Sequence, residues 1–247
     1  MRALTLAFAM ITGWTTLTAG TVEPRQLTTS RGAKVYAVLH RPDTPGRVPA
    51  IVIAPGMGYD MDRPIIKDLA EAAARHGFAA IRFNWNYYST DPKSGRPSSE
   101  LANEIDDFRA ALEVAKNDPH IDPSRIVIAG KSMGSLAAWT IFSQDSALRG
   151  LFLLTPIFSE EGAYPGLAAS TRPVVIVVGN DDPSSPLPRM YSALAQTKGN
   201  VAAVVVGGNH GLNVGPKDDP AHARSNADNI ATAIQAILHW ADLALKK

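Results

Sequence analysis

Short apolar runs alternate with amphipathic stretches along this chain, and this alternation is the feature that most constrains its fold. The expected strands are residues 26–30, 34–39, 50–54, 78–83, 125–129, 150–154, 173–178 and 201–206. The expected helices are residues 64–75, 98–116, 133–142, 188–195 and 226–244. Runs such as Ile51-Val52-Ile53 have no polar alternation, which is typical of strands covered on both faces. The order predicts an α/β fold, a mostly parallel sheet with helices on both faces that opens with a hairpin.

Composition is consistent with one globular domain over residues 21–247. The chain has 247 residues, of which 45% are hydrophobic and 19% charged, enough to bury a sizeable core. Its 24 basic and 23 acidic residues nearly cancel, so no surface for nucleic acid is expected. Because the chain has no cysteine, disulfides, zinc–thiolate sites and a cysteine nucleophile are excluded.

The first twenty residues differ from the rest. Arg2 precedes a mostly apolar stretch that ends near Trp14, and small residues follow up to Gly20. This pattern predicts a signal peptide over residues 1–20, because the apolar part is too short for a membrane span. We therefore expect a periplasmic or secreted protein with no membrane span in the mature chain. An N-terminal anchor that stays attached is the alternative.

One strand leads directly into a motif that carries chemistry. The strand expected at 125–129 is followed by Gly130-Lys131-Ser132-Met133-Gly134 and then by a helix. A serine on such a tight strand-to-helix turn needs small neighbours, because the backbone there is strained. The turn projects Ser132 Oγ outward and places the Met133 N–H at a helix N-terminus. Ser132 is therefore the candidate nucleophile, and Met133 a candidate oxyanion-hole donor.

A serine nucleophile needs a base, and the base needs a carboxylate that orients it. Asp181 and Asp182 follow the strand at 173–178, and His210 follows the strand at 201–206. Ser132, Asp182 and His210 then occur in the order expected of an α/β-hydrolase. We prefer Asp182 because the following proline favours an extended conformation there, and Asp181 is the alternative. No spacing of histidines and carboxylates indicates a metal site, and no cofactor is expected.

Two other segments are candidates for the walls of the site. Pro55-Gly56-Met57-Gly58 follows an early strand, so the Met57 N–H is the candidate second oxyanion donor, with Gly58 as the alternative. Trp85, Tyr87 and Tyr88 follow another strand and are candidate substrate-binding aromatics, or else they pack on the core. Residues 155–172, where many hydrolases insert a cap, form a short segment. A large cap is therefore not expected.

These motifs together resemble an α/β-hydrolase of the dienelactone-hydrolase-like clan, over about residues 50–210. The loop at 55–62, Ile81-Arg82-Phe83-Asn84 and above all the G-K-S-M-G turn are similar to small hydrolases related to testis-expressed and nonspecific-lethal-complex subunit proteins. Two positions depart from the pattern. The family usually has His-Gly where this chain has Pro55-Gly56. Dienelactone hydrolases have a cysteine in place of Ser132, which argues against dienelactone as substrate.

The resulting hypothesis is a carboxylesterase-like serine hydrolase that acts on small-molecule esters through an acyl-enzyme. An open site without a large cap favours small or accessible esters. The hydrolysis of amides, thioesters or carbon–carbon bonds is an alternative within the same chemistry. A non-catalytic protein that uses the fold for binding or scaffolding is the alternative from another class. The sequence leaves the oligomeric state open.

Overall fold

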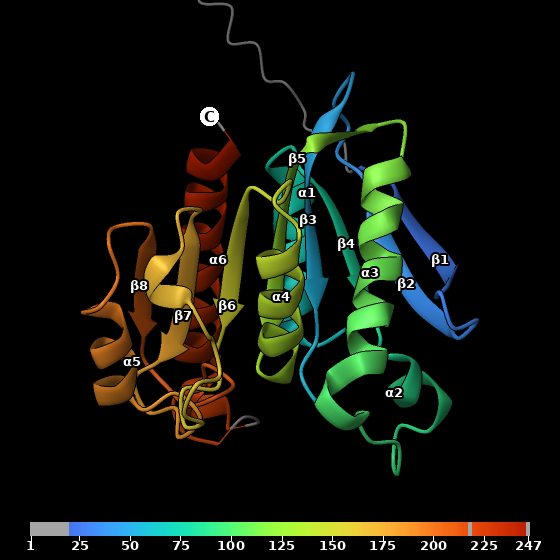
Figure 1. Cartoon of the computed structure of the whole chain (residues 1–247). Helices are drawn as coiled ribbons and strands as arrows, with labels where there is room; N and C mark the ends of the chain where they lie inside the picture. The colour runs from blue at the N-terminus through green and yellow to red at the C-terminus, as the bar shows by residue number, and fades with distance from the viewer. Residues whose placement is uncertain (1–19, 217–218, 246–247) are drawn as a thin grey trace, which may run out of the picture.

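The computed structural model describes residues 20–216 and 219–245, and its centre is one eight-stranded sheet (Figure 1). The strands are β1 Val22–Thr28, β2 Lys34–His40, β3 Val48–Ala54, β4 Ala79–Phe83, β5 Ile121–Lys131, β6 Gly150–Leu154, β7 Val174–Gly179 and β8 Val201–Val206. They lie in the order β1-β2-β4-β3-β5-β6-β7-β8. Both pairings of β2 are antiparallel and the others are parallel. This arrangement confirms the expected hairpin and mostly parallel sheet.

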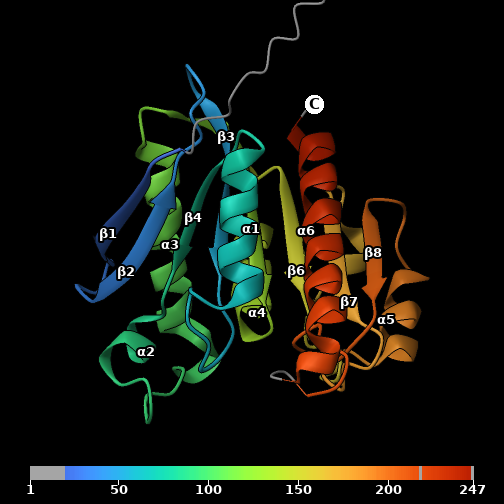
Figure 2. The ribbon, with the colours of Figure 1, turned by 180° about the vertical axis from the view of Figure 1, so that it is seen from behind.

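Helices cover both faces of the sheet. They are α1 Pro64–Arg75, α2 Asn86–Thr90, α3 Ala102–Asn117, α4 Met133–Gln144, α5 Leu187–Leu194 and α6 Ala223–Leu245. Figures 1 and 2 show α3 and α4 on one face and α1 and α6 on the other. Successive residues of a strand point to opposite faces. Val52 accordingly belongs to the core under α3 and α4, whereas Ile51 and Ile53 belong to the core under α1 and α6.

Some boundaries differ from those that the sequence predicts. Helix α3 begins at Ala102 rather than at 98, because Glu100 and Leu101 have positive φ angles of 52° and 58° that interrupt a helix. Ser98 precedes the 3-10 turn Ser99–Leu101, and its Oγ accepts a hydrogen bond of 2.9 Å from the Asn103 N–H in the first turn of α3. Helix α2 was not expected, because five residues are too few to show a helical period.

The sequence predicts neither a large cap nor a membrane span in the mature chain. Between β6 and β7 the described chain forms only a short 3-10 turn at Leu167–Ala169, so no large cap is present there. Within residues 20–216 and 219–245, no helix combines the length and the apolar character that a membrane crossing requires. Residues 1–19 of the expected signal peptide lie outside the described residues, so that prediction stays a prediction.

His40 in β2 makes folding stability depend on pH. Its side chain is buried, and its Nε2 accepts a hydrogen bond of 3.0 Å from Arg82 Nε. Burial, together with the positive charge of Arg82, lowers the pKa of His40 to about 4. The pKa of a histidine in an unfolded chain is ~6.5. Between these pH values the unfolded chain binds more protons, so the stability is complete above about pH 6.5 and is lost as the pH falls toward 4.

Between pH 7 and pH 4.5, we expect the unfolding free energy of the wild type to fall by about 2–3 kcal/mol more than that of His40→Gln. Glutamine still offers an oxygen to Arg82 but does not titrate in this range. Urea unfolding of both proteins at the two pH values measures the difference. Equal losses in wild type and variant would assign the pH dependence to other groups.

Candidate active site

The turn after β5 holds Ser132 in a strained conformation that brings several backbone segments close together. Ser132 has φ 51° and ψ −123°, a region that residues other than glycine rarely adopt. A Cβ on Gly130 would lie 2.2 Å from the carbonyl oxygen of Gly134, and one on Gly134 would lie 2.3 Å from that of Pro55. Both glycines are therefore required by space, as the motif predicts. The serine stands at the carboxyl end of the sheet, directly before α4.

The loops after β7 and β8 bring a carboxylate and an imidazole together at the same edge. His210 Nδ1 lies 2.9 Å from Asp182 Oδ2 and 3.0 Å from Oδ1. The Asp182 side chain is 0% exposed, whereas that of His210 is 32% exposed. A carboxylate that accepts the Nδ1 proton leaves Nε2 as the basic nitrogen. Within the described residues no hydrogen bond joins Ser132 to His210, and such contacts often tighten only when substrate binds.

The two adjacent aspartates have different environments. Asp182 Oδ1 also accepts a hydrogen bond of 2.9 Å from the Ser184 N–H, which holds the carboxylate in place. Asp181 is exposed, and its backbone N–H donates to the Gly208 carbonyl at 2.9 Å. The structure thus brings Asp182, and not Asp181, to His210.

The loop after β3 lies against Ser132. A Cβ on Gly56 would lie 3.3 Å from Ser132 Cβ, so glycine permits the close approach. The Gly58 N–H donates to Tyr87 Oη at 3.1 Å, and it is therefore already engaged. Of the two candidate donors, only the Met57 N–H is therefore left to donate to an oxyanion. The N–H of Met133, the first residue of α4, has no acceptor within its own helix.

The aromatic residues expected to contact substrate divide into two groups. Trp85 is 0% exposed, and its Nε1 donates to the carbonyl oxygens of Pro55 at 3.1 Å and Gly56 at 3.2 Å. The expectation that Trp85 lines an open wall is therefore wrong, because its ring fills the core and its N–H supports the loop. Tyr87 and Tyr88 are partly exposed, and Tyr87 holds Gly58.

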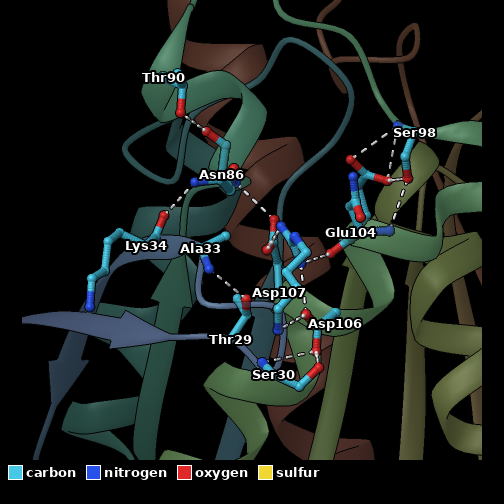
Figure 3. Close-up of polar contacts among 12 residues, drawn as sticks. Thr29, Ser30, Ala33, Lys34, Asn86, Thr90, Ser98, Glu104, Asp106 and Asp107 are labelled. Atoms are coloured by element: carbon cyan, nitrogen blue, oxygen red, sulfur yellow. Dashed lines mark hydrogen bonds and ion pairs between the residues drawn. The ribbon is translucent and has the colours of Figure 1, made fainter.

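A buried carboxylate that the sequence analysis missed anchors α2 (Figure 3). Asp107 Oδ2 accepts a hydrogen bond of 2.8 Å from the Asn86 N–H, and Oδ1 pairs with Arg31 Nη2 at 2.6 Å. Burial raises the pKa of Asp107 to about 6, although these two partners act in the opposite direction. Asp107 lies on the apolar face of α3 beside Phe108. A carboxylate at such a position is the sequence signal that could have identified it.

We expect Tyr87→Phe to lower the kcat of the catalysed reaction about fivefold, the value of one hydrogen bond of ~1 kcal/mol. The reason is that the Gly58 N–H loses its acceptor, so the neighbouring Met57 N–H is held less firmly. Tyr88→Phe is the matched control and should stay near wild type. Equal rates in both variants, with unchanged thermal stability, would remove Tyr87 from this role.

Lys131 is a second residue that the sequence analysis did not single out beyond its place in the turn. Its side chain is buried at 3% exposure, and its ammonium contacts the loop of His210.

Among the described residues, no three His, Asp or Glu side chains gather closely enough to hold a metal ion. A groove of about 570 Å³, lined in part by Arg149, Trp240 and Leu243, lies at the amino ends of β6, β7 and β8. It is at the opposite edge of the sheet from Ser132.

Curated relatives cover parts of the chain. The quorum-quenching protein AidA of Acinetobacter baumannii is 29% identical over 127 residues, 51% of this chain and 41% of that protein. An uncharacterized protein of Mycobacterium tuberculosis is 30% identical over 188 residues, 66% of this chain and 64% of that protein. The chain thus spans less than two thirds of the length of these relatives.

Solved structures show the same fold. A serine hydrolase homologue from Coxiella burnetii has a TM-score of 0.68 and 20% identity, covering 87% of this chain and 96% of the other. An esterase from Pyrococcus furiosus has a TM-score of 0.68 and 15% identity, covering 92% and 94%. A family model described as an alpha/beta hydrolase domain matches residues 47–242, from the start of the parallel sheet into the last helix. On the strength of that match, this chain belongs to the alpha/beta hydrolase domain family.

Proposed function

We propose that this protein is a serine hydrolase that cleaves small or accessible esters. The observation that carries the proposal is the buried Asp182 carboxylate on His210 Nδ1, at the sheet edge where Ser132 occupies a strained turn. A serine, an oriented imidazole and a buried carboxylate are the groups that acyl transfer requires. The esterase neighbours and the family support hydrolysis as the general reaction.

In the proposed mechanism, His210 Nε2 accepts the proton of Ser132 Oγ while the oxygen attacks the ester carbonyl. Asp182 stabilises the imidazolium, and the Met133 and Met57 N–H groups donate to the oxyanion. The carbon–oxygen bond to the alcohol then breaks, and His210 returns its proton to the leaving oxygen. Water, deprotonated by His210, attacks the acyl-enzyme, which releases the acid and restores Ser132.

The openness of the site supports small or accessible esters as substrates. Met57 is 63% exposed, and the side chain of His210 is 32% exposed. The short segment between β6 and β7 carries no helical cap that would enclose a long chain. The G-K-S-M-G resemblance supports placement among the small hydrolases of the dienelactone-hydrolase-like clan. The predicted signal peptide supports action in the periplasm or outside the cell.

The test combines an active-site label with a panel of acyl donors. A fluorophosphonate probe should label the wild type at Ser132, as located by peptide mass spectrometry. p-Nitrophenyl acetate and butyrate should react faster than octanoate and laurate, and a lactone, a thioester and an anilide complete the panel. Absence of labelling would favour a binding or scaffold protein. Labelling with turnover of only the thioester or anilide would show that the serine chemistry is right and the ester wrong.

A further inference from the structure

One buried ammonium contacts the loops that carry the candidate catalytic groups. Lys131 is the last residue of β5 and the chain neighbour of Ser132. Its Nζ donates to Thr155 Oγ1 at 3.0 Å and to the His210 carbonyl oxygen at 3.2 Å. The same atom lies 5.0 Å from the centre of the Tyr59 ring, in the loop after β3. The Lys131 side chain therefore joins the turn of the nucleophile to the loop of the base.

The surroundings of this ammonium give no packing reason for a charge. The small cavity beside it is lined mainly by apolar side chains, among them Ile65, Leu154, Val177 and Leu212. Burying an ammonium among such groups is costly, and a methionine of similar length fits the same kind of space better. The cost is visible in the pKa of Lys131, which burial lowers to about 8 against the attraction of Asp182. A functional role for the Lys131 ammonium would explain why a charge occupies this apolar position.

The contact with His210 reaches the backbone and not the ring. The ring is oriented by Asp182, but the distance between His210 and Ser132 depends on where two separate loops lie. The Lys131 side chain connects these loops over 79 positions of sequence. Thr155, its other partner, directly follows β6 and has a positive φ of 40°, an uncommon conformation for a residue other than glycine. The hydrogen bonds of Lys131 thus fix the position of the His210 loop relative to the Ser132 turn.

The charge of Lys131 has few titratable neighbours. The titratable groups near it are Asp182, from the loop after β7, and Tyr59, whose pKa is raised to about 12 by burial, while His210 meets it through a backbone carbonyl. The side chains of α1, β6 and β7 around it are uncharged. The negative charge of Asp182 attracts the ammonium.

We propose that Lys131 is a positioning residue for hydrolysis, whose ammonium holds the His210 loop against the Ser132 turn. The inference rests on the proposed function, because positioning matters only if Ser132 and His210 react. It assigns a role to the second residue of the G-K-S-M-G turn. The catalytic atoms remain those of Ser132 and His210.

The first test replaces the charge by a methyl thioether of similar length. Lys131→Met should lower kcat/KM about 100-fold, the size of effect expected from misplaced reacting groups. The wild-type rate should decline above about pH 8 as Lys131 loses its proton, and the variant should lack this decline. Thr155→Val, which removes only one of the two hydrogen-bond partners, should lower kcat/KM less than Lys131→Met does.

A chemical rescue separates the ammonium from simple packing. The chain has no cysteine, so Lys131→Cys introduces a unique thiol. Alkylation of the unfolded variant with bromoethylamine forms a carbon–sulfur bond with loss of bromide and a proton, and it restores an ammonium at nearly the length of lysine. Alkylation with bromoethane gives the uncharged match. After refolding, the aminoethylated protein should be at least tenfold more active than the ethylated one. Equal activity in two folded proteins would overturn the inference.

A further measurement keeps the inference apart from the proposed function. Fluorophosphonate labelling of the wild type tests whether Ser132 is a nucleophile at all, and failure to label would reject the proposed function. In folded Lys131→Met the rate of labelling at Ser132 should fall at least tenfold, because the His210 loop is no longer held against the turn. An unchanged labelling rate in the folded variant would overturn the inference and leave the proposed function in place.

Discussion

Ser132→Ala is expected to lower kcat/KM for p-nitrophenyl butyrate about 10⁴-fold or more, with no loss of the fold. The substitution removes one oxygen, and the proposed acyl-enzyme has no other atom on which to form. The backbone strain at φ 51° is the same for alanine as for serine, because both carry a Cβ. The free energy of unfolding should therefore stay within about 0.5 kcal/mol of the wild type.

The measurement is steady-state turnover beside urea unfolding, with both proteins purified identically. Ser143→Ala, in the same helix α4 that follows the turn, is the matched control for loss of a serine hydroxyl. Its Oγ donates to the Trp139 carbonyl oxygen and is remote from the loops of Asp182 and His210 in sequence. A folded Ser132→Ala protein that retained a tenth of the wild-type turnover would remove Ser132 from the role of nucleophile.

Asp182→Asn is expected to lower kcat/KM about 10³- to 10⁴-fold, the second largest effect. An asparagine amide can donate to His210 Nδ1, which would place the ring proton on Nε2, where the base is needed. It also removes the negative charge that stabilises the imidazolium. The carboxylate is 0% exposed and holds His210 through both oxygens, so water cannot replace it easily.

Asp181→Asn is the matched control for this prediction, because it makes the same chemical change one residue earlier. Asp181 is exposed and contributes a backbone N–H, which asparagine keeps. Its kcat/KM should stay within about twofold of the wild type, as for an ordinary surface substitution. A larger loss in Asp181→Asn than in Asp182→Asn would reassign the acid.

The two predictions rest on different kinds of knowledge. Ser132 is recognisable from sequence because its requirements are local: a buried strand, two glycines and a helix, all within adjacent residues. The glycines prove necessary for contacts within this turn and with Pro55. Asp182 and Asp181 are indistinguishable by residue type, and only the path of the loop after β7 decides which of them meets His210, 28 positions further on.

Other parts of the site depended on packing that no local pattern encodes. Trp85 follows a strand toward the expected site, but its ring turns into the core and its N–H holds two carbonyl groups of a loop about thirty positions earlier. Asp107 looks like one more charge in a helix until Arg31, 76 positions away, is placed beside it. Helix α2, with five residues, has no period to detect.

The sequence by itself determined the alternation of strands and helices, the mostly parallel sheet, and the chain positions at which a candidate nucleophile, acid and base follow their strands. These properties follow from side-chain periodicity and from backbone strain, which act over a few neighbouring residues. Only the tertiary structure decided which groups meet: Asp182 with His210, Tyr87 with Gly58, and Lys131 with the His210 loop. The reason is that such contacts join segments far apart in the chain, whose relative positions are set by strand register and by the packing of the whole core.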